Sequence, residues 1–268
     1  MILLDGKLLA PKILSELKEK ISKLSFPINL DIVLVGNDPS SVKYVELKQQ
    51  KASEIGIGGH FYHLSENTSP QELEKIIEAL NNNHETSSFF VQLPIPNIFD
   101  SSSILNKILP GKDADGLTSI NLGLLFQQHL NAVAPATAIG IIKLLDEYKI
   151  NLEGKKIVIV NDSPIVGLPL LALFNARYAT VTLCHMHTQN LSEVTQRADI
   201  LISATGVMGL ITASMVKDKV IAIDVGGGDI DFESVSKKSS YITPTFGGVG
   251  PMTVASLLVN TYLLATRI

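Results

Sequence analysis

Short runs of apolar residues alternate along the chain with longer segments of helical periodicity. The runs predicted to be strands are 31–35, 89–91, 156–160, 179–183, 200–204 and 220–225. They lack the strict alternation of a half-exposed strand, which is typical of parallel strands covered on both faces. Helices are predicted between them at 39–55, 70–81, 137–148 and 168–176, followed by a last apolar helix over 254–264. This order indicates an α/β fold with right-handed crossovers.

A chain of 268 residues is long enough for two modest domains around a cleft. Domain boundaries are predicted near 111–121 and again near Pro244. The stretch 156–241 is typical of a self-contained nucleotide-binding βαβ domain. The predicted fold class is therefore α/β with two domains, of which the C-terminal one is a Rossmann-like parallel sheet.

Composition narrows the class of protein. Hydrophobic residues make up 46% of the chain, which favours a globular fold. The net charge is -4 and no basic patch stands out, so no nucleic-acid partner is expected. Cys184 is the only cysteine, which suits a reducing cytoplasm. The N-terminus has no signal-peptide pattern, and no apolar run reaches the roughly 20 residues of a membrane span.

A glycine-rich loop precedes the last helix. It runs from Tyr241 to Thr253 and packs its glycines and prolines into its second half. Glycines let a backbone approach a flat ligand closely, and Pro251 next to Thr253 is a helix-start signal. The loop is predicted to form a ligand wall. The alternative is a glycine-rich turn with a helix cap.

The predicted helix over 39–55 carries a candidate reactive lysine. Asp38 can cap this helix, with Pro39 at its first position. Tyr44, Lys48 and Lys51 are spaced by four and three residues, so they share one face. This face is either a functional face or a solvated lysine face with an amphipathic tyrosine.

Two further polar segments carry candidate functional side chains. Gln92 follows a strand and precedes a rigid Pro-x-Pro, and a buried amide there needs a hydrogen-bond partner. The alternative is an exposed amide. In the segment 111–116, Asp113 and Asp115 form either a metal site or a loop turn. An EF-hand is excluded, because no oxygen-rich run follows.

The segment 160–169 lies between a predicted strand and a predicted helix. There a dinucleotide pyrophosphate would meet the helix N-terminus, although the ordinary G-x-G-x-x-G pattern is missing. The cluster Cys184-His185-Met186-His187 has metal-binding residue types. We expect no metal, because the chain has no second cysteine and a strand end explains the segment.

In combination these segments resemble the bifunctional methylenetetrahydrofolate dehydrogenase/methenyltetrahydrofolate cyclohydrolases. That family's patterns are ITPVPGGVGPMT, S-x-x-Y-V-x-x-K, V-Q-L-P-L-P, K-D-V-D-G and G-x-S-x-I-V-G-x-P. The similarity runs from Asp5-Gly6-Lys7 to the last helix. It implies oxidation of 5,10-methylenetetrahydrofolate with NADP or NAD, and hydrolysis of the methenyl product to 10-formyltetrahydrofolate. These reactions belong to one-carbon metabolism and purine biosynthesis.

The resemblance also implies a domain division and an assembly. Residues 1–115 plus 250–268 would form the folate-binding catalytic domain, and 116–249 the NAD(P)-binding domain. The family implies a cytoplasmic homodimer whose partners are tetrahydrofolate derivatives, with no nucleic acid and no membrane.

The site residues follow from the same resemblance. Lys48 would be the catalytic lysine, with Tyr44 shielding it and Gln92 orienting it. A lysine in a partly dry cleft can be neutral near pH 7, so it can accept and donate protons. The residues implied to bind folate are Tyr44, Asp115, Gly248 and Pro251. Those implied to bind the cofactor are Asn161, Asp162, Ser163, Ile165, Val166, Gly167, His185, Thr205, Gly206 and Gly226.

The chain departs from the family mainly on the nucleotide side. Asn161 replaces the first glycine, and the turn should survive because Asn adopts a left-handed backbone readily. Asp162 stands where Arg is frequent and would repel the 2′-phosphate of NADP, while Met186 replaces a serine that can hold that phosphate. Phe246 replaces a proline, and the loop after Gly226 is short. We therefore expect poor NADP binding.

The sequence also allows other functions. One is an enzyme that prefers NAD or keeps only cyclohydrolase activity, and another is a catalytically silent folate-binding protein. The presence of both Lys48 and Gln92 argues against silence. An unrelated Rossmann dehydrogenase is disfavoured by the missing glycine pattern.

Overall fold

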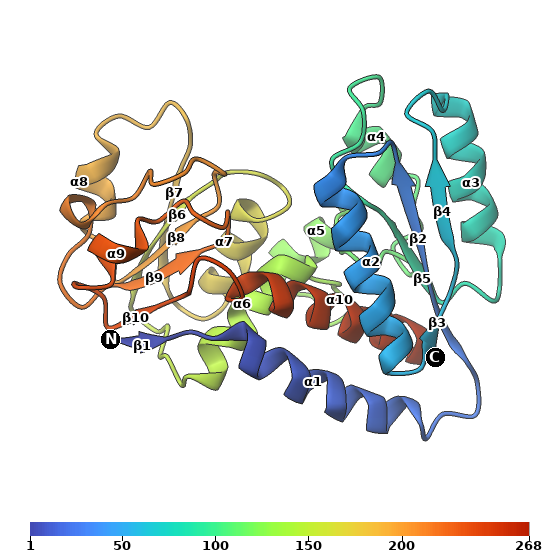
Figure 1. Ribbon diagram of the computed structural model, residues 1–268, viewed down its shortest axis with the longest axis horizontal. Coiled ribbons are helices and arrows are strands. Elements are labelled where there is room, and N and C mark those ends of the chain that lie inside the picture. The colour runs from blue at the N-terminus through green and yellow to red at the C-terminus, as the bar shows by residue number, and fades with distance from the viewer. Residues whose placement is uncertain (268) are drawn as a thin grey trace. The chain divides into compact units, whose positions relative to one another are not determined.

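The structure is a computed structural model that describes residues 1–267. The chain forms two compact units, each built on a parallel sheet (Figure 1). The six-stranded unit comprises Met1–Pro11, Leu125–His129 and Thr137–Thr253. The four-stranded unit comprises Lys12–Leu124, Leu130–Ala136 and, within the described residues, 254–267. The α/β class with a Rossmann-like parallel sheet is confirmed, whereas the division into 1–115 plus 250–268 and 116–249 stays a prediction.

The helices and strands have the following bounds. The six-stranded unit contains β1 (Ile2–Leu3), α6 (Ala136–Glu147), β6 (Lys156–Val160), α7 (Gly167–Asn175), β7 (Thr180–Cys184), α8 (Leu191–Thr195), β8 (Ile200–Ser203), β9 (Ile221–Asp224), α9 (Phe232–Val235) and β10 (Tyr241–Ile242), with a 3-10 turn at Ala213–Met215. The four-stranded unit contains β2 (Ile28–Val35), α2 (Pro39–Glu54), β3 (Ile57–Gly58), β4 (Phe61–Leu64), α3 (Pro70–Asn82), β5 (Ser88–Val91), α4 (Ser101–Leu105) and most of α5 (Ser119–Phe126). The long helices α1 (Gly6–Ile21) and α10 (Val249–Thr266) contribute residues to both units, as do the ends of α5 and α6.

The six-stranded sheet has the order β1-β10-β9-β8-β6-β7, and every pairing in it is parallel. Its central strands were predicted within one or two residues, because their continuous apolar runs are buried on both faces. The two-residue strands β1 and β10 were not predicted. They pair with each other at two positions, Ile2 with Tyr241 and Leu3 with Ile242. A strand of two residues is too short to produce a recognisable sequence pattern.

In the four-stranded sheet, β2 pairs in parallel with β3, β4 and β5. Helix α3 covers one face, where Leu73 and Ile77 pack with Val33 and Val91 of β2 and β5. Its N-terminus is a capping box between Ser69 and Glu72. Helix α2 lies on the other side of β2, as Figure 1 shows. Strand β4 was not predicted. Its residues are half buried, and His63 within it is exposed, so the strand has no continuous apolar run.

Helix α10 begins five residues before the predicted start at 254, because the glycine-rich segment already turns helical at Val249. Within residues 1–267 it is the one helix whose length and composition would allow a membrane crossing. However, 61% of that stretch is buried inside the protein, as expected of a core helix. Its buried residues include Met252, Leu257 and Leu258.

Candidate functional site

Lys48 lies on the buried face of α2. The Asp38 side chain accepts a hydrogen bond from the Ser41 amide at 2.8 Å, and Pro39 occupies the first turn, so the predicted cap is confirmed. Val45 and Lys48 point inward from this helix, and Lys48 is only 2% exposed. Lys51 instead remains partly exposed and pairs with Glu54 at 2.8 Å. The helix therefore buries one lysine and leaves the other at the surface.

The ammonium group of Lys48 has one amide and two aromatic neighbours. Its Nζ donates to Gln92 Oε1 at 3.0 Å. It also lies 4.1 Å from the ring centroid of Phe90 and 4.9 Å from that of Tyr44. Gln92 Nε2 donates to the Leu93 carbonyl at 2.6 Å, and this bond directs the amide oxygen toward the lysine. The predicted partner for a buried Gln92 is thus Lys48.

Burial shifts the protonation equilibria of two groups in opposite directions. Desolvation lowers the pKa of Lys48, and the negative charge of Asp115 raises it in part. Desolvation likewise raises the pKa of Asp115, while Lys48 lowers it and Asp113 raises it further. The charges of Lys48 and Asp115 therefore interact, and the structure brings Tyr44, Lys48, Gln92 and Asp115 together within the four-stranded unit.

Asp113 organises the loop that carries Asp115. Its carboxylate accepts hydrogen bonds from Gly116 N at 2.9 Å, Thr118 N at 2.8 Å and Asn121 Nδ2 at 2.9 Å. Of the two interpretations of this acidic pair, the geometry therefore favours the loop turn. Within the described residues, no group of three His, Cys, Asp or Glu side chains could hold a metal ion. Asn121 belongs to this network and was not predicted.

The turn between β6 and α7 is held by the side chain of Asn161. Its Oδ1 accepts from Ser163 N at 2.9 Å, Ser163 Oγ at 2.7 Å and Gly167 N at 3.0 Å. Its Nδ2 donates to the Ala204 carbonyl at 2.7 Å. Asn161 is not among the residues with positive φ, so the predicted left-handed backbone is wrong. The amide stabilises the turn through hydrogen bonds, and a Cβ on Gly167 would lie 2.0 Å from the Asn161 carbonyl oxygen.

Two buried carboxylates that had no predicted role fix the loops after β8 and β9. Asp229 is 1% exposed and accepts from Ser203 Oγ at 2.8 Å, from Thr205 Oγ1 at 2.9 Å and from the Thr205 amide. Asp224 accepts from the amides of Gly227 and Gly228 at 2.8 and 2.9 Å. Burial raises the pKa of Asp224. Two Asp residues around a glycine run are the signal that would have identified this arrangement.

The remaining nucleotide-side residues lie at one edge of the six-stranded sheet. Asn161, His185, Thr205 and Gly226 come directly after, or within two residues of, the carboxyl ends of β6, β7, β8 and β9. These strands are neighbours and parallel, so their carboxyl ends share an edge, where open α/β sheets bind ligands. Residues of the same loops that are exposed there are Asp162, Ile165, Met186 and Gly206.

Helix α7 supplies the other feature of that edge. It begins at Gly167, and its N-cap residue Val166 makes no side-chain cap.

Gly248 and Pro251 also belong to the six-stranded unit. There a Cβ on Gly6 would lie 1.8 Å from the Gly248 carbonyl oxygen, so the glycine-rich loop packs directly on the start of α1.

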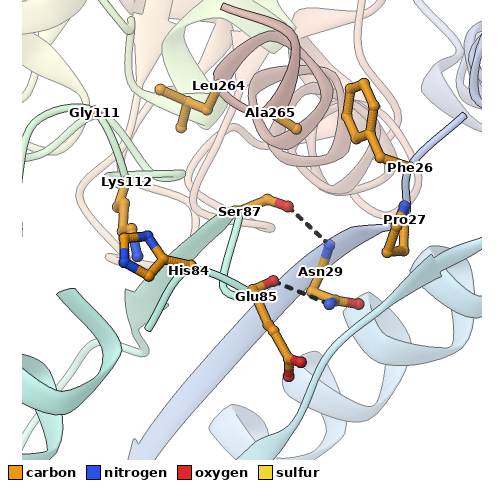
Figure 2. A pocket seen from close by; sticks show the side chains of 10 residues that line it. All are labelled: Phe26, Pro27, Asn29, His84, Glu85, Ser87, Gly111, Lys112, Leu264 and Ala265. Carbon is orange, nitrogen blue, oxygen red and sulfur yellow. Dashed lines mark hydrogen bonds between the residues drawn. The ribbon is translucent and has the colours of Figure 1, made fainter. Parts of the chain in front are cut away.

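A separate cavity of about 650 Å³ opens in the four-stranded unit, and Figure 2 shows its lining. Asn29 is held there by bonds to Ser87 Oγ and the Glu85 carbonyl. Lys112 donates to the carbonyls of Leu80 and Asn83. None of the predicted site residues lines this cavity, and the bonds of Asn29 and Lys112 hold the fold there.

Comparison with known proteins identifies the family of this chain. Residues 4–115 match the catalytic domain of tetrahydrofolate dehydrogenase/cyclohydrolase, and residues 135–268 match its NAD(P)-binding domain. The chain belongs to the tetrahydrofolate dehydrogenase/cyclohydrolase family. The predicted family, the dehydrogenase and cyclohydrolase activities and the NAD(P) cofactor are thereby confirmed.

Individual relatives match over their whole length. The chain is 43% identical to the bifunctional protein FolD of Nitratiruptor sp., covering 100% of this chain and 99% of the relative. The crystal structure of the bifunctional enzyme FolD from Campylobacter jejuni superposes with a TM-score of 0.97 at 44% identity, covering 99% of this chain and 98% of the other. That of the Trypanosoma brucei enzyme, complexed with NADP cofactor and inhibitor, has a TM-score of 0.96 at 32% identity, covering 100% and 98%.

The burial of Lys48 predicts a pH-dependent stability. The pKa of Lys48 is lowered from 10.5 in the folded protein, so the unfolded chain binds one more proton between that lowered value and 10.5. The free energy of unfolding should therefore fall as the pH falls through this window, by at most about 1.4 kcal/mol per pH unit. In Lys48→Met this slope should be absent. Urea unfolding of both proteins between about pH 8 and pH 10 measures the difference.

Lys51→Met is the matched control, because Lys51 lies on the same helix but stays partly exposed. It should keep the slope of the parent. A parent and a Lys48→Met variant with identical pH slopes would contradict the burial of an uncharged amine.

Proposed function

We propose that Lys48 is the proton-transfer residue with which this chain hydrolyses 5,10-methenyltetrahydrofolate, the product of its NAD(P)-dependent oxidation of 5,10-methylenetetrahydrofolate. The observation that carries the proposal is the buried amine of Lys48, which donates to Gln92 Oε1 at 3.0 Å. Burying an amine costs stability, so its presence here favours a functional role, and a lowered pKa makes the amine easier to deprotonate and so more available as a proton acceptor.

The hydrolytic step needs one proton to be moved twice. Neutral Lys48 takes a proton from water as the oxygen attacks the amidinium carbon of the substrate. The resulting ammonium then gives that proton to the ring nitrogen whose bond to the carbon breaks. The new hydroxyl loses its own proton to solvent water as it becomes the carbonyl of the formyl group on the other nitrogen. Gln92 accepts a hydrogen bond from Lys48, and the rings of Phe90 and Tyr44 stabilise the ammonium between the two transfers.

Asp115 is the proposed contact to the pterin ring. A carboxylate can accept two hydrogen bonds from adjacent ring and amino N–H groups, which recognises the ring and orients it. The interaction between the charges of Asp115 and Lys48 supports placing substrate and base near each other. We assign Gly248 and Pro251 to the same substrate on the family pattern alone.

On the nucleotide side, the bound cofactor would accept the hydride. Within the six-stranded unit, the turn held by Asn161 and the uncapped start of α7 at Gly167 suit the pyrophosphate. The rest of the cofactor would be contacted from the neighbouring strand ends by His185, Thr205, Gly206 and Gly226. Asp229 keeps Thr205 in place. The role of these residues is to bind and orient, because the redox chemistry belongs to the cofactor.

We also propose that NAD is preferred to NADP. Asp162 is exposed directly after the strand end of β6, and the exposed loop after β7 offers Met186, which is 91% exposed and has no phosphate-binding group. A carboxylate near an extra phosphate costs free energy, whereas it can accept hydrogen bonds from ribose hydroxyls.

The assembly and location are further parts of the proposal. A homodimer in the cytoplasm that acts on folates, with neither nucleic acid nor membrane as a partner, is supported by the family resemblance. The cytoplasmic location is also supported by the single cysteine, Cys184, which is free and buried. The domain division 1–115 plus 250–268 against 116–249 is proposed on the same ground.

The first experiment is a pair of assays on the purified protein. Hydrolysis of methenyltetrahydrofolate is followed by absorbance, and oxidation of methylenetetrahydrofolate is followed with NAD and NADP separately. Lys48→Ala should lower the hydrolysis rate by about 10²- to 10⁴-fold, which is the usual contribution of a positioned proton-transfer group. Lys51→Ala should leave the rate unchanged, because Lys51 pairs with Glu54 at the surface.

Full hydrolysis by Lys48→Ala would contradict the assigned role. If the unmodified protein binds folate but is inactive in both assays, the chain is a silent folate-binding protein instead.

The pH profile of hydrolysis gives an independent prediction. Because the carboxylate of Asp115 raises the pKa of Lys48, Asp115→Asn should lower that pKa. At saturating substrate, the rising limb of kcat against pH should then move to lower pH by about one unit. Gln92→Glu adds a negative charge at the lysine and should move the limb to higher pH. Shifts of the same sign in both variants would disprove the electrostatic coupling.

Cofactor preference is tested by removing one charge. Asp162→Asn should lower the KM for NADP about fivefold, equivalent to about 1 kcal/mol of relieved repulsion, with the KM for NAD unchanged. The effect should shrink as salt is added. A parent enzyme that already uses NADP ten times better than NAD would refute the proposal outright.

A further inference from the structure

Helix α10 carries an amide in the middle of an apolar stretch. Asn260 is 6% exposed and follows the buried pair Leu257 and Leu258. An unbonded amide at such a position costs free energy, so its hydrogen bonds explain its presence. An apolar side chain of similar size would fill the position without that cost.

The amide of Asn260 bonds to two segments of the four-stranded unit. Its Nδ2 donates to the carbonyl of Ala114 at 3.0 Å and to that of Ala134 at 3.0 Å. Ala114 is fully buried and directly precedes Asp115. The single NH₂ group therefore joins the loop that carries Asp115 to a segment far from it in the sequence, using both of its protons.

The two joined segments are already close. A Cβ on Gly116 would lie 2.6 Å from the carbonyl oxygen of Val133, and Gly116 has a φ of +71°. The Ala136 amide donates to the Asp115 carbonyl at 3.3 Å. From inside the loop, Asp113 binds Gly116 N. On the other side of Asp115, the Ala114 amide donates to the Phe89 carbonyl at 3.2 Å, and Asn260 binds the Ala114 carbonyl.

Other buried polar residues of α10 do not have this role. Thr261 Oγ1 donates to the Leu257 carbonyl of the same helix, and Ser256 Oγ is buried with no partner. Among these side chains, only that of Asn260 links α10 to the loop that carries Asp115.

We infer that Asn260 is a positioning residue for Asp115, which holds the backbone so that the carboxylate meets the pterin ring of the folate. The inference rests on the proposed role of Asp115 in substrate recognition. Asn260 acts through the backbone at Ala114 and has no direct role at Lys48 or at the reacting atoms. It should therefore govern substrate affinity and orientation, which a purely structural contact would not.

The test compares Michaelis constants for the two substrates of the dehydrogenase reaction. Asn260→Leu keeps the branched shape of the side chain and removes both donors. It should raise the KM for methylenetetrahydrofolate about tenfold, while the KM for the nicotinamide cofactor stays at the parent value. Ser256→Ala is the matched control, since it removes a buried hydroxyl without a partner one turn earlier on the same helix. Both Michaelis constants should be unchanged in it.

A lowered thermal midpoint with the folate KM unchanged would overturn the inference, because it would make Asn260 a structural contact only. If Asn260→Leu does not fold, Asn260→Ser retains one donor and should show a smaller rise in the same KM. An unchanged KM in that variant overturns the inference equally.

A double-mutant cycle separates this inference from the function on which it rests. In an Asp115→Asn background, Asn260→Leu should add no further rise in the folate KM. Additive effects would show that Asn260 acts on substrate by another route and would reject the positioning role. If Asp115→Asn alone leaves the KM unchanged, the assigned role of Asp115 fails, and the inference falls with it.

Discussion

The site depends on one buried amine. Lys48 is nearly inaccessible to water, lies against the rings of Phe90 and Tyr44, and has Gln92 Oε1 as its hydrogen-bond acceptor. In water an ammonium group would be strongly favoured, whereas here desolvation works against the charge. The Gln92 amide and the aromatic faces stabilise the protonated form enough for it to occur. Burial and these neighbours therefore act in opposite directions on the pKa of Lys48, and burial has the larger effect.

Backbone geometry around both halves of the molecule is controlled by side-chain amides and carboxylates. Asn161 holds the turn after β6, Asp229 holds the loop after β8, and Asp113 and Asn260 hold the loop of Asp115. Each is a polar side chain that satisfies backbone groups in a segment with no regular structure. This common solution puts loops at strand ends into fixed conformations, which a ligand site requires.

The two compact units have different tasks in the proposed chemistry. In the four-stranded unit, proton transfer needs a dry environment, and Lys48 and Gln92 are buried there. In the six-stranded unit, the carboxyl edge of the sheet leaves Asp162, Met186 and Gly206 exposed, where a large dinucleotide can bind. The charge that would distinguish NAD from NADP is at the surface, so a single substitution there can change cofactor choice without disturbing the core.

The sequence by itself determined the α/β class, the central strands and the residues of the folate motifs. Continuous apolar runs and local motifs are read within short windows, where periodicity and capping residues act. Only the tertiary structure decided which lysine is buried, since Lys48 and Lys51 share a predicted face but only Lys48 packs against β5. It also decided that Asn161 acts through its side chain and that Asn260 meets Ala114. Those contacts join residues far apart in the chain, and no local pattern encodes them.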